Sequence, residues 1–308
     1  MPYSSREIED LYDQPSFDDH LESLRAKGLQ YRAKLIRSGD AMLEVEIYPI
    51  NPIWKDNKNK PRVKPVRPSR KAQKDLNQAN TRKHVSRLIH TNFTRNDIWV
   101  TFTYGREHMP ADVAEATKHL KNYFKRLRRH IKKHGLPELK YIYVTERTEN
   151  EKTGKVHTHH HVIMNFRDRD TAEALWTLGG RTHARRLQPD KDGSLGGLAN
   201  YISKPETKEG NRKGDKTYAR SKNLVKPDPI TSPNRLPLTG YRISKKRISE
   251  MAINENTAIR VLEENYKGYR VADIKVKFSE YTAGVFIYVH MVNPYANMPA
   301  SVDRRLRE

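Results

Sequence analysis

Hydrophobic and polar positions between residues 97 and 135 follow two different periods, and each period predicts one kind of secondary structure. The segment DIWVTFTY, residues 97–104, alternates Trp99, Thr101 and Thr103 with Ile98, Val100 and Phe102, which predicts a half-buried strand. Apolar residues then recur at spacings of three and four between Pro110 and Gly135. This spacing predicts an amphipathic helix that has proline at its start and glycine at its end.

The next 70 residues continue the alternation of strands and helices. The pattern predicts strands over residues 140–147 and 156–165, joined by a polar turn, and later a strand over 181–187. Short helices are predicted over 170–178 and 195–204, the second closed by Pro205. The resulting order β-α-β-β-α-β-α predicts an α+β fold with a central antiparallel sheet and flanking helices.

The two ends of the chain have patterns of their own. Residues 29–36 and 41–48 predict a hairpin, and residues 55–74 carry nine basic residues, one acid and three prolines. A helical pattern covers residues 70–90, and residues 205–240 form a second basic, proline-punctuated stretch. The tail predicts a helix over 249–266 and a hairpin formed by 270–278 and 284–292.

We therefore divide the chain into three parts. They are an N-terminal hairpin with a basic, proline-rich arm (1–91), a central domain (92–226), and a C-terminal basic linker with an accessory helix and hairpin (227–308). The basic arm is either a solvated linker or a segment that follows phosphates. The candidate DNA-binding residues are Lys64, Arg67, Arg70, Lys71, Arg220 and Lys222.

Charge and composition narrow the class of protein. The 308 residues include 59 Lys and Arg against 37 Asp and Glu, which gives a net charge of +22 and makes nucleic acid the first partner to test. The absence of cysteine excludes a disulfide scaffold, a thiol nucleophile and cysteine-based metal sites. No apolar segment is long enough to span a membrane and no secretory signal is present, so we expect a cytoplasmic protein.

A histidine cluster marks the predicted strand 156–165. His157, His159 and His161 alternate with other residues and so project from one face, where neutral imidazoles can share a divalent metal, whereas His160 points the other way. Glu146 lies across the predicted hairpin from about position 160 and is the natural further ligand. The alternatives are a polar strand with incidental histidines, and a Glu146 that pairs with a cation.

The predicted helix 195–204 carries Tyr201 and Lys204 on one flank, three residues apart. On periodicity alone, a tyrosine at this position belongs to the edge of the core. Its phenol is nevertheless a competent nucleophile toward phosphorus when a cation such as Lys204 stabilises the developing charge.

Three segments together resemble the HUH endonucleases, in particular the single-tyrosine Rep proteins that initiate rolling-circle replication of plasmids and phages. IWVTFTY (98–104) resembles the first family motif, HHHVIM (159–164) the His-U-His motif, and YISK (201–204) the Tyr-x-x-Lys motif. The resemblance covers roughly residues 92–226, and the tyrosine follows the histidines as in Rep proteins rather than conjugative relaxases. It departs from the family pattern in two ways: His160 occupies the usually hydrophobic position U, and His157 with His159 offers a second possible pair.

The resemblance implies a fold with a ferredoxin-like core and a specific chemistry. His159, His161 and Glu146 would hold Mg²⁺ or Mn²⁺, and His157 would be an outer residue. Tyr201 would attack the scissile phosphodiester, forming a 5′-phosphotyrosine and a free 3′ hydroxyl, and would later allow the strand to be rejoined, while Lys204 orients or activates the phenol. This activity would make the protein a site-specific nickase and strand transferase.

The implied substrate is single-stranded or hairpin origin DNA. A host polymerase would extend the free 3′ hydroxyl, and because the sequence has no Walker A pattern, a host helicase would separate the strands. Two other functions stay open on the residues alone. One is a non-catalytic basic nucleic-acid-binding protein with a structural metal, and the other is a metal phosphodiesterase that activates water.

Overall fold

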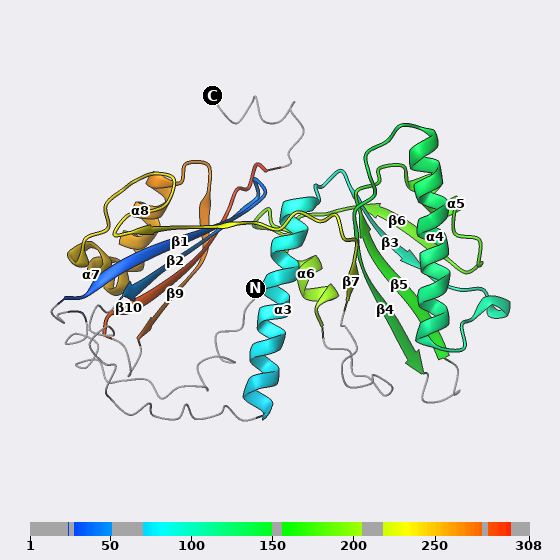
Figure 1. The fold of residues 1–308 in the computed structure, drawn as a ribbon, viewed down its shortest axis with the longest axis horizontal. Coiled ribbons are helices and arrows are strands. Elements are labelled where there is room, and N and C mark those ends of the chain that lie inside the picture. The colour runs from blue at the N-terminus through cyan, green and yellow to red at the C-terminus, as the bar shows by residue number, and fades with distance from the viewer. Residues whose placement is uncertain are drawn as a thin grey trace.

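The computed structural model describes residues 24, 28–50, 70–149, 156–204, 218–278 and 283–296. Within these residues the fold is α+β, as predicted, and contains two five-stranded antiparallel sheets. Helix α3 (Arg70–Asn92) lies between the two sheets (Figure 1). We call them the central sheet, with strand order β6-β3-β5-β4-β7, and the terminal sheet, with strand order β8-β1-β2-β10-β9.

The central sheet has the predicted order of elements as far as α6, and it gains a short edge strand, β7, that the sequence did not predict. Its strands are β3 (Ile98–Phe102), β4 (Tyr141–Glu149), β5 (Val156–Met164), β6 (Thr182–Arg186) and the short β7 (Ala219–Arg220). Its helices are α4 (Val113–Lys133), α5 (Arg169–Ala174) and α6 (Gly196–Ile202), and a 3-10 turn, η3 (Arg106–His108), follows β3. Helix α4 begins after Pro110 rather than at it, because Asp112 caps the helix by accepting a hydrogen bond from the Glu115 N–H.

Strand alternation gives the central sheet two differently covered faces. On one face, Val100, Phe102 and Val162 pack against the apolar stripe of α4. On the other face, Trp99, Ile142 and Ile163 pack against α3 and α6, which bury the residues Val85, Leu88, Ile89, Ala199 and Ile202. The second face continues along the strands and carries the predicted histidines, from the buried His161 through the half-buried His159 to the exposed His157.

The terminal sheet joins the two ends of the chain. Its strands are β1 (Gln30–Ser38), β2 (Met42–Ile50), β8 (Pro229–Pro233), β9 (Arg270–Phe278) and β10 (Val285–Val292), with β2 paired to β10. The N-terminal hairpin and the C-terminal hairpin, which the sequence led us to place in separate parts, therefore form one sheet. Each hairpin has an apolar face, and pairing them side by side allows one pair of helices to cover both.

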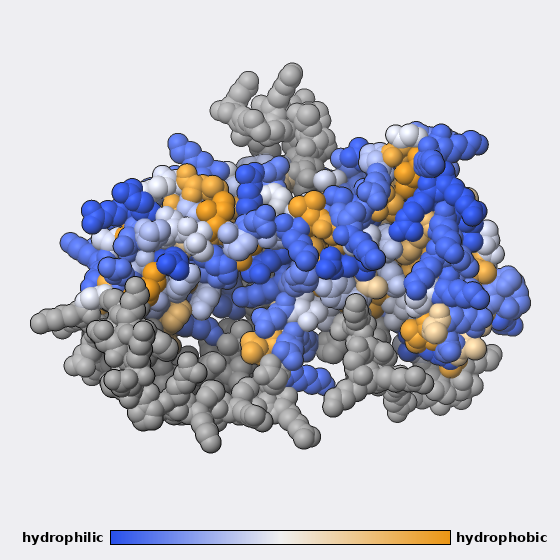
Figure 2. Space-filling model, in the orientation of Figure 1, coloured by the Kyte–Doolittle hydropathy of each residue, from blue (hydrophilic) through white to orange (hydrophobic). Residues whose placement is uncertain are grey.

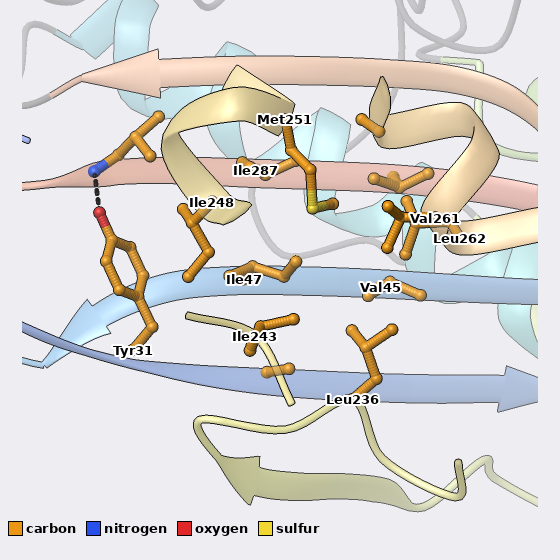
Figure 3. Packing of buried hydrophobic residues seen from close by; sticks show 14 of the residues in the cluster. Tyr31, Val45, Ile47, Leu236, Ile243, Ile248, Met251, Val261, Leu262 and Ile287 are labelled. Carbon is orange, nitrogen blue, oxygen red and sulfur yellow. Dashed lines mark hydrogen bonds between the residues drawn. The ribbon is translucent and has the colours of Figure 1, made fainter. Parts of the chain in front are cut away.

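Helices α7 (Lys245–Ile253) and α8 (Glu255–Asn265) cover one face of the terminal sheet, where Ile248, Met251 and Leu262 pack on Val45 and Ile287 (Figure 3). At one end of this core the Tyr31 hydroxyl accepts a hydrogen bond from the Val285 N–H at 3.1 Å (Figure 3). The single helix predicted over 249–266 is two helices, because Asn254 ends α7 and caps α8 through its side chain.

Helix α3 contacts both sheets. Its apolar side chains pack on the central sheet, while Arg87 forms a two-pronged ion pair with Glu44 of β2, with N–O distances of 2.5 and 3.2 Å. Gly39, at the β1–β2 turn, has a φ of +59°, and an added Cβ would collide with the His90 carbonyl oxygen. The turn can therefore approach α3 closely only as glycine.

The surface of the described residues is mainly hydrophilic in the view of Figure 2, in keeping with the net charge of +22. Among the described residues, no helix has the length and apolar character that a membrane crossing requires.

Candidate active site

Three side chains from three different elements meet on the histidine-bearing face of the central sheet, where His161 is buried and Glu146 and Tyr201 are half-buried. The Tyr201 hydroxyl lies 3.0 Å from His161 Nε2 and donates a hydrogen bond to Glu146 Oε2 at 3.3 Å. His161 Nε2 and Glu146 Oε2 are themselves 3.3 Å apart. The three polar atoms thus form a closed triangle, and the sequence had predicted all three residues as site members.

The strand register explains why Glu146 and His161 face the same way. Antiparallel pairing of β4 with β5 places Glu146 directly opposite His159, and directly opposed residues share a face of the sheet. Sequence reasoning had placed Glu146 opposite about position 160, where a one-residue error would reverse its face. The observed pairing puts the carboxylate on the histidine face.

Tyr201 reaches this face because α6 is bonded to other elements at its start and closed by its own cap at its end. At its start, the Leu195 N–H donates to His90 Nε2 at 2.8 Å and the Gly197 N–H donates to Asp190 Oδ2 at 2.7 Å. At its end, the Ser203 hydroxyl donates to the Ala199 carbonyl at 2.7 Å. The seven-residue helix is too short to be stable alone, so these bonds and its packing on α3 hold Tyr201 in place.

Strand β3 supplies two further residues that sequence reasoning did not assign to the site. The Trp99 ring stacks on His161, with centroids 5.5 Å apart, and meets Tyr201 edge-on at 5.4 Å. Thr101 is paired with His161 in the sheet, and its hydroxyl lies 3.1 Å from His161 Nδ1. The alternation in residues 98–104 already placed both on one face, but only the pairing of β3 with β5 shows that this face is the histidine face.

His160 stands where the motif that this segment resembles usually has a hydrophobic residue. It is completely buried on the opposite face, where the Tyr104 hydroxyl lies 2.7 Å from its Nε2 and the Thr145 hydroxyl 2.8 Å from its Nδ1. Burial lowers the pKa of His160 to about 3, so the ring is neutral and behaves as an internal polar residue with both nitrogens satisfied. It occupies the place of a hydrophobic residue without leaving an unpaired group.

The other predicted site residues surround the triangle. His159 is half-buried on the same face, with its ring centroid 6.4 Å from that of His161. His157 is exposed and lies opposite Thr148, farther along the strand pair. Lys204 is exposed, and its Nζ lies 5.5 Å from the centre of the Tyr201 ring.

The surroundings favour one protonation state for each of Glu146, His159 and Tyr201. The hydrogen bond with His161 lowers the pKa of Glu146, which favours a carboxylate, and burial lowers the pKa of His159, which favours a neutral imidazole. Burial and the neighbouring Glu146 raise the pKa of Tyr201 to about 12. The phenol is therefore protonated at rest and must give up its proton in order to attack a substrate.

The donor types fit a divalent cation. Binding requires a deprotonated carboxylate and neutral imidazoles, which are the states that the surroundings favour for Glu146 and His159. Among the described residues, however, no three histidine or acidic side chains already stand in a metal-ligating arrangement. Glu146 and His161 are in contact, and His159, directly across the ladder from Glu146, stands outside that contact.

The predicted DNA-binding residues are not gathered at the triangle. Lys64 and Arg67 lie outside the described residues. Arg70 and Lys71 form the start of α3, Arg220 lies in β7 at the edge of the central sheet, and Lys222 is exposed just after it.

Comparison with known protein families supports one class of protein for the part of the chain that carries this site. Residues 97–206 match the family model described as replication-associated protein ORF2/G2P. The match spans β3 to just beyond α6 and so includes all residues of the triangle. It supports a replication initiator family for this part of the chain. No match was found among curated proteins or among solved structures.

Proposed function

We propose that this protein initiates DNA replication by nicking a single strand, with Tyr201 as the nucleophile. The observation that carries the proposal is the contact of the Tyr201 hydroxyl with His161 and Glu146, on a sheet face that lies within the family match. A packing tyrosine at the edge of a core has no need of two polar partners at its hydroxyl. A nucleophile that must lose a proton does need them.

The reaction is an exchange of one phosphodiester for another. The Tyr201 oxygen attacks the phosphorus, its proton leaves toward the His161–Glu146 pair, and the 3′ oxygen departs and takes up a proton. The products are a 5′-phosphotyrosine and a free 3′ hydroxyl, which can prime synthesis. Attack by a later 3′ hydroxyl reverses the step and releases Tyr201, so the bond count is conserved and no nucleoside triphosphate is consumed.

Each neighbouring residue has a separate task in this scheme. The Thr101 hydroxyl at Nδ1 and the contacts of Nε2 with Tyr201 and Glu146 hold the His161 ring between the phenol and the carboxylate. Trp99 fixes the planes of both rings, and the Lys204 ammonium attracts the phosphodiester to the exposed side of Tyr201. His159, His161 and Glu146 would hold Mg²⁺ or Mn²⁺, which supplies Lewis-acid polarisation of the phosphate when bound.

The proposed substrate is single-stranded or hairpin origin DNA, because the scissile phosphate must reach an open sheet face. A host helicase would expose that strand and a host polymerase would extend the 3′ hydroxyl. We propose these partners because the site supplies only the strand exchange.

The test is covalent trapping on labelled single-stranded circular DNA with Mn²⁺, resolved on a denaturing gel. The proposal predicts a protein-linked DNA band that is lost in Tyr201→Phe and in His161→Ala. Tyr218→Phe is the matched control, because Tyr218 packs against the same cluster as Tyr201 and is not part of the triangle. A band that persists in Tyr201→Phe would refute the nucleophile.

The two other functions give different results in the same experiment. A metal phosphodiesterase that activates water would cleave the DNA without forming a protein-linked band, and its cleavage would survive Tyr201→Phe. A non-catalytic binding protein would retain the DNA in a native gel and produce no cleavage at all.

A further inference from the structure

The face of the terminal sheet opposite α7 and α8 carries aromatic side chains that its core does not use. Strand β10 alternates, so that Ile287 and Val289 enter the core, whereas Phe286, Tyr288 and His290 lie on the other face and are half-buried. Tyr48 of β2 is also half-buried and lies on this second face, two residues from Glu46, which pairs with Tyr288. We call this second face, over Tyr48, Phe286 and Tyr288, the aromatic face.

The two rings on β10 form a flat pair. The planes of Phe286 and Tyr288 differ by only 8°, and their centroids are 6.5 Å apart. This spacing follows from their positions two residues apart on one strand, which rises about 3.3 Å per residue. Two parallel, half-buried rings on one sheet face offer consecutive stacking positions for planar groups.

Basic residues surround the rings. Lys275 lies opposite Tyr288 and Lys277 opposite Phe286 in the β9–β10 ladder. The exposed Arg32 lies opposite Tyr48 in the β1–β2 ladder, on the same face of the sheet. The Lys83 ammonium of α3 lies 6.0 Å from the centre of the Tyr288 ring. The planar ligand that such a surface favours is therefore anionic.

The acidic side chains on this part of the face form ion pairs with neighbouring basic side chains. Glu46 pairs with Lys34 at 2.9 Å, and Asp273 pairs with Lys275 at 3.6 Å. Toward α3, Glu44 is bound by an arginine of that helix, which covers this end of the face. Among the described residues near the rings, Arg32, Lys83 and Lys277 are present in addition to these pairs, so positive side chains outnumber negative ones.

We propose that the aromatic face binds single-stranded DNA, with unpaired bases stacked on Phe286 and Tyr288 and the backbone held by Lys275, Lys277 and Arg32. Parallel aromatic rings flanked by cations are the combination by which proteins hold unpaired nucleic acid with little sequence preference. A duplex keeps its bases stacked on each other and cannot use the rings. The choice of DNA as the ligand rests on the proposed function, and the site is separate from Tyr201.

The test measures equilibrium binding of full-length protein to fluorescent single-stranded DNA of about 30 nucleotides, long enough to extend beyond one site. All variants carry Tyr201→Phe, so that covalent chemistry does not contribute to retention. Replacing Phe286 and Tyr288 with leucine keeps apolar bulk and removes both stacking surfaces, and we expect affinity to fall by about tenfold or more. The ring-preserving pair Phe286→Tyr and Tyr288→Phe should keep the parent affinity.

Two further variants separate stacking from charge and from folding. Tyr295→Leu removes another aromatic ring, 45% exposed, that lies outside the aromatic face, and it should not change affinity. Lys275→Ala with Lys277→Ala should lower the slope of log affinity against log salt by about 0.7 for each phosphate that is no longer neutralised. Thermal melting of each variant identifies loss of fold.

The outcomes are distinct from those of the nicking test. A loss in the double-leucine variant that is absent from the ring-preserving pair and from Tyr295→Leu, with duplex binding unchanged, supports the aromatic face even if no covalent adduct is ever found. Unchanged affinity in a folded double-leucine variant overturns the proposal even if Tyr201 is the nucleophile. An equal loss on duplex and single-stranded DNA also overturns it, because base stacking would then not be the cause.

Discussion

Replacing His90 with leucine tests whether one buried imidazole anchors the helix that carries Tyr201. His90 is 4% exposed, its Nε2 accepts the Leu195 N–H at 2.8 Å, and its Nδ1 donates to the Ser86 carbonyl at 2.8 Å. Leucine fills a similar volume but leaves the Leu195 N–H buried without a partner. The expected loss of unfolding free energy is about 2 kcal/mol near neutral pH, the cost of one unsatisfied buried donor.

The same substitution has a second effect, which depends on pH. Burial lowers the pKa of His90 to about 4 from its usual 6.5, and nearby His290 acts in the same direction while Asp192 and Glu44 oppose it. Between these two pKa values the unfolded chain binds a proton that the folded chain does not. The stability contributed by neutral His90 is thus complete above pH 6.5 and is lost as the pH falls toward 4.

The coupling between protonation of His90 and folding predicts a measurable difference in the effect of His90→Leu at two pH values. Wild-type protein loses about 2 kcal/mol through His90 between pH ~7 and pH ~5, whereas the leucine variant has no such group to protonate. The destabilisation by His90→Leu should therefore be about 2 kcal/mol at the higher pH and near zero at the lower. Urea unfolding of both proteins at the two pH values is the assay. An equal destabilisation at both would refute the reasoning.

Other positions give simpler expectations. Arg87→Met should destabilise the protein by about 3 kcal/mol in urea unfolding, because Glu44 is left largely buried without its cation. Gly180→Ala should lower the melting temperature, since φ is +76° and the new Cβ would lie 2.6 Å from Thr103 backbone. Leu238→Gly should raise stability by about 1 kcal/mol, because this leucine is 65% exposed with a φ of +68°. Tyr201→Phe should abolish the covalent adduct while circular dichroism stays unchanged.

The main strands and helices of the central sheet could be predicted from the sequence, but the short β7 and the order in which the strands pair could not. Its strands alternate and its longest helix carries a regular apolar stripe, so local patterns and element order specify the fold. The terminal sheet could be predicted only in part. Its two hairpins follow from the sequence, but β2 and β10 lie more than 200 residues apart in the chain, and no local pattern indicates that they pair.

The candidate site was likewise predictable where it depends on local sequence and unpredictable where it depends on strand pairing. His161, Glu146 and Tyr201 were predicted from residue type and motif order, and the structure brings them together. Trp99 and Thr101 were missed as site members because their position depends on the pairing of β3 with β5. The burial of His160 beneath the sheet could be predicted only in part, since alternation gives its face but not the hydroxyl partners that satisfy it.

The most direct test of the central claim is the identity and polarity of the covalent link. A single-stranded origin oligonucleotide labelled at either end is incubated with the protein and Mn²⁺, and the adduct is digested and sequenced by mass spectrometry. The account predicts that the label 3′ to the nick stays with the protein, that the label 5′ to it is released, and that the modified peptide carries the DNA on Tyr201. A link to any other residue, or retention of the 5′ segment, would contradict it.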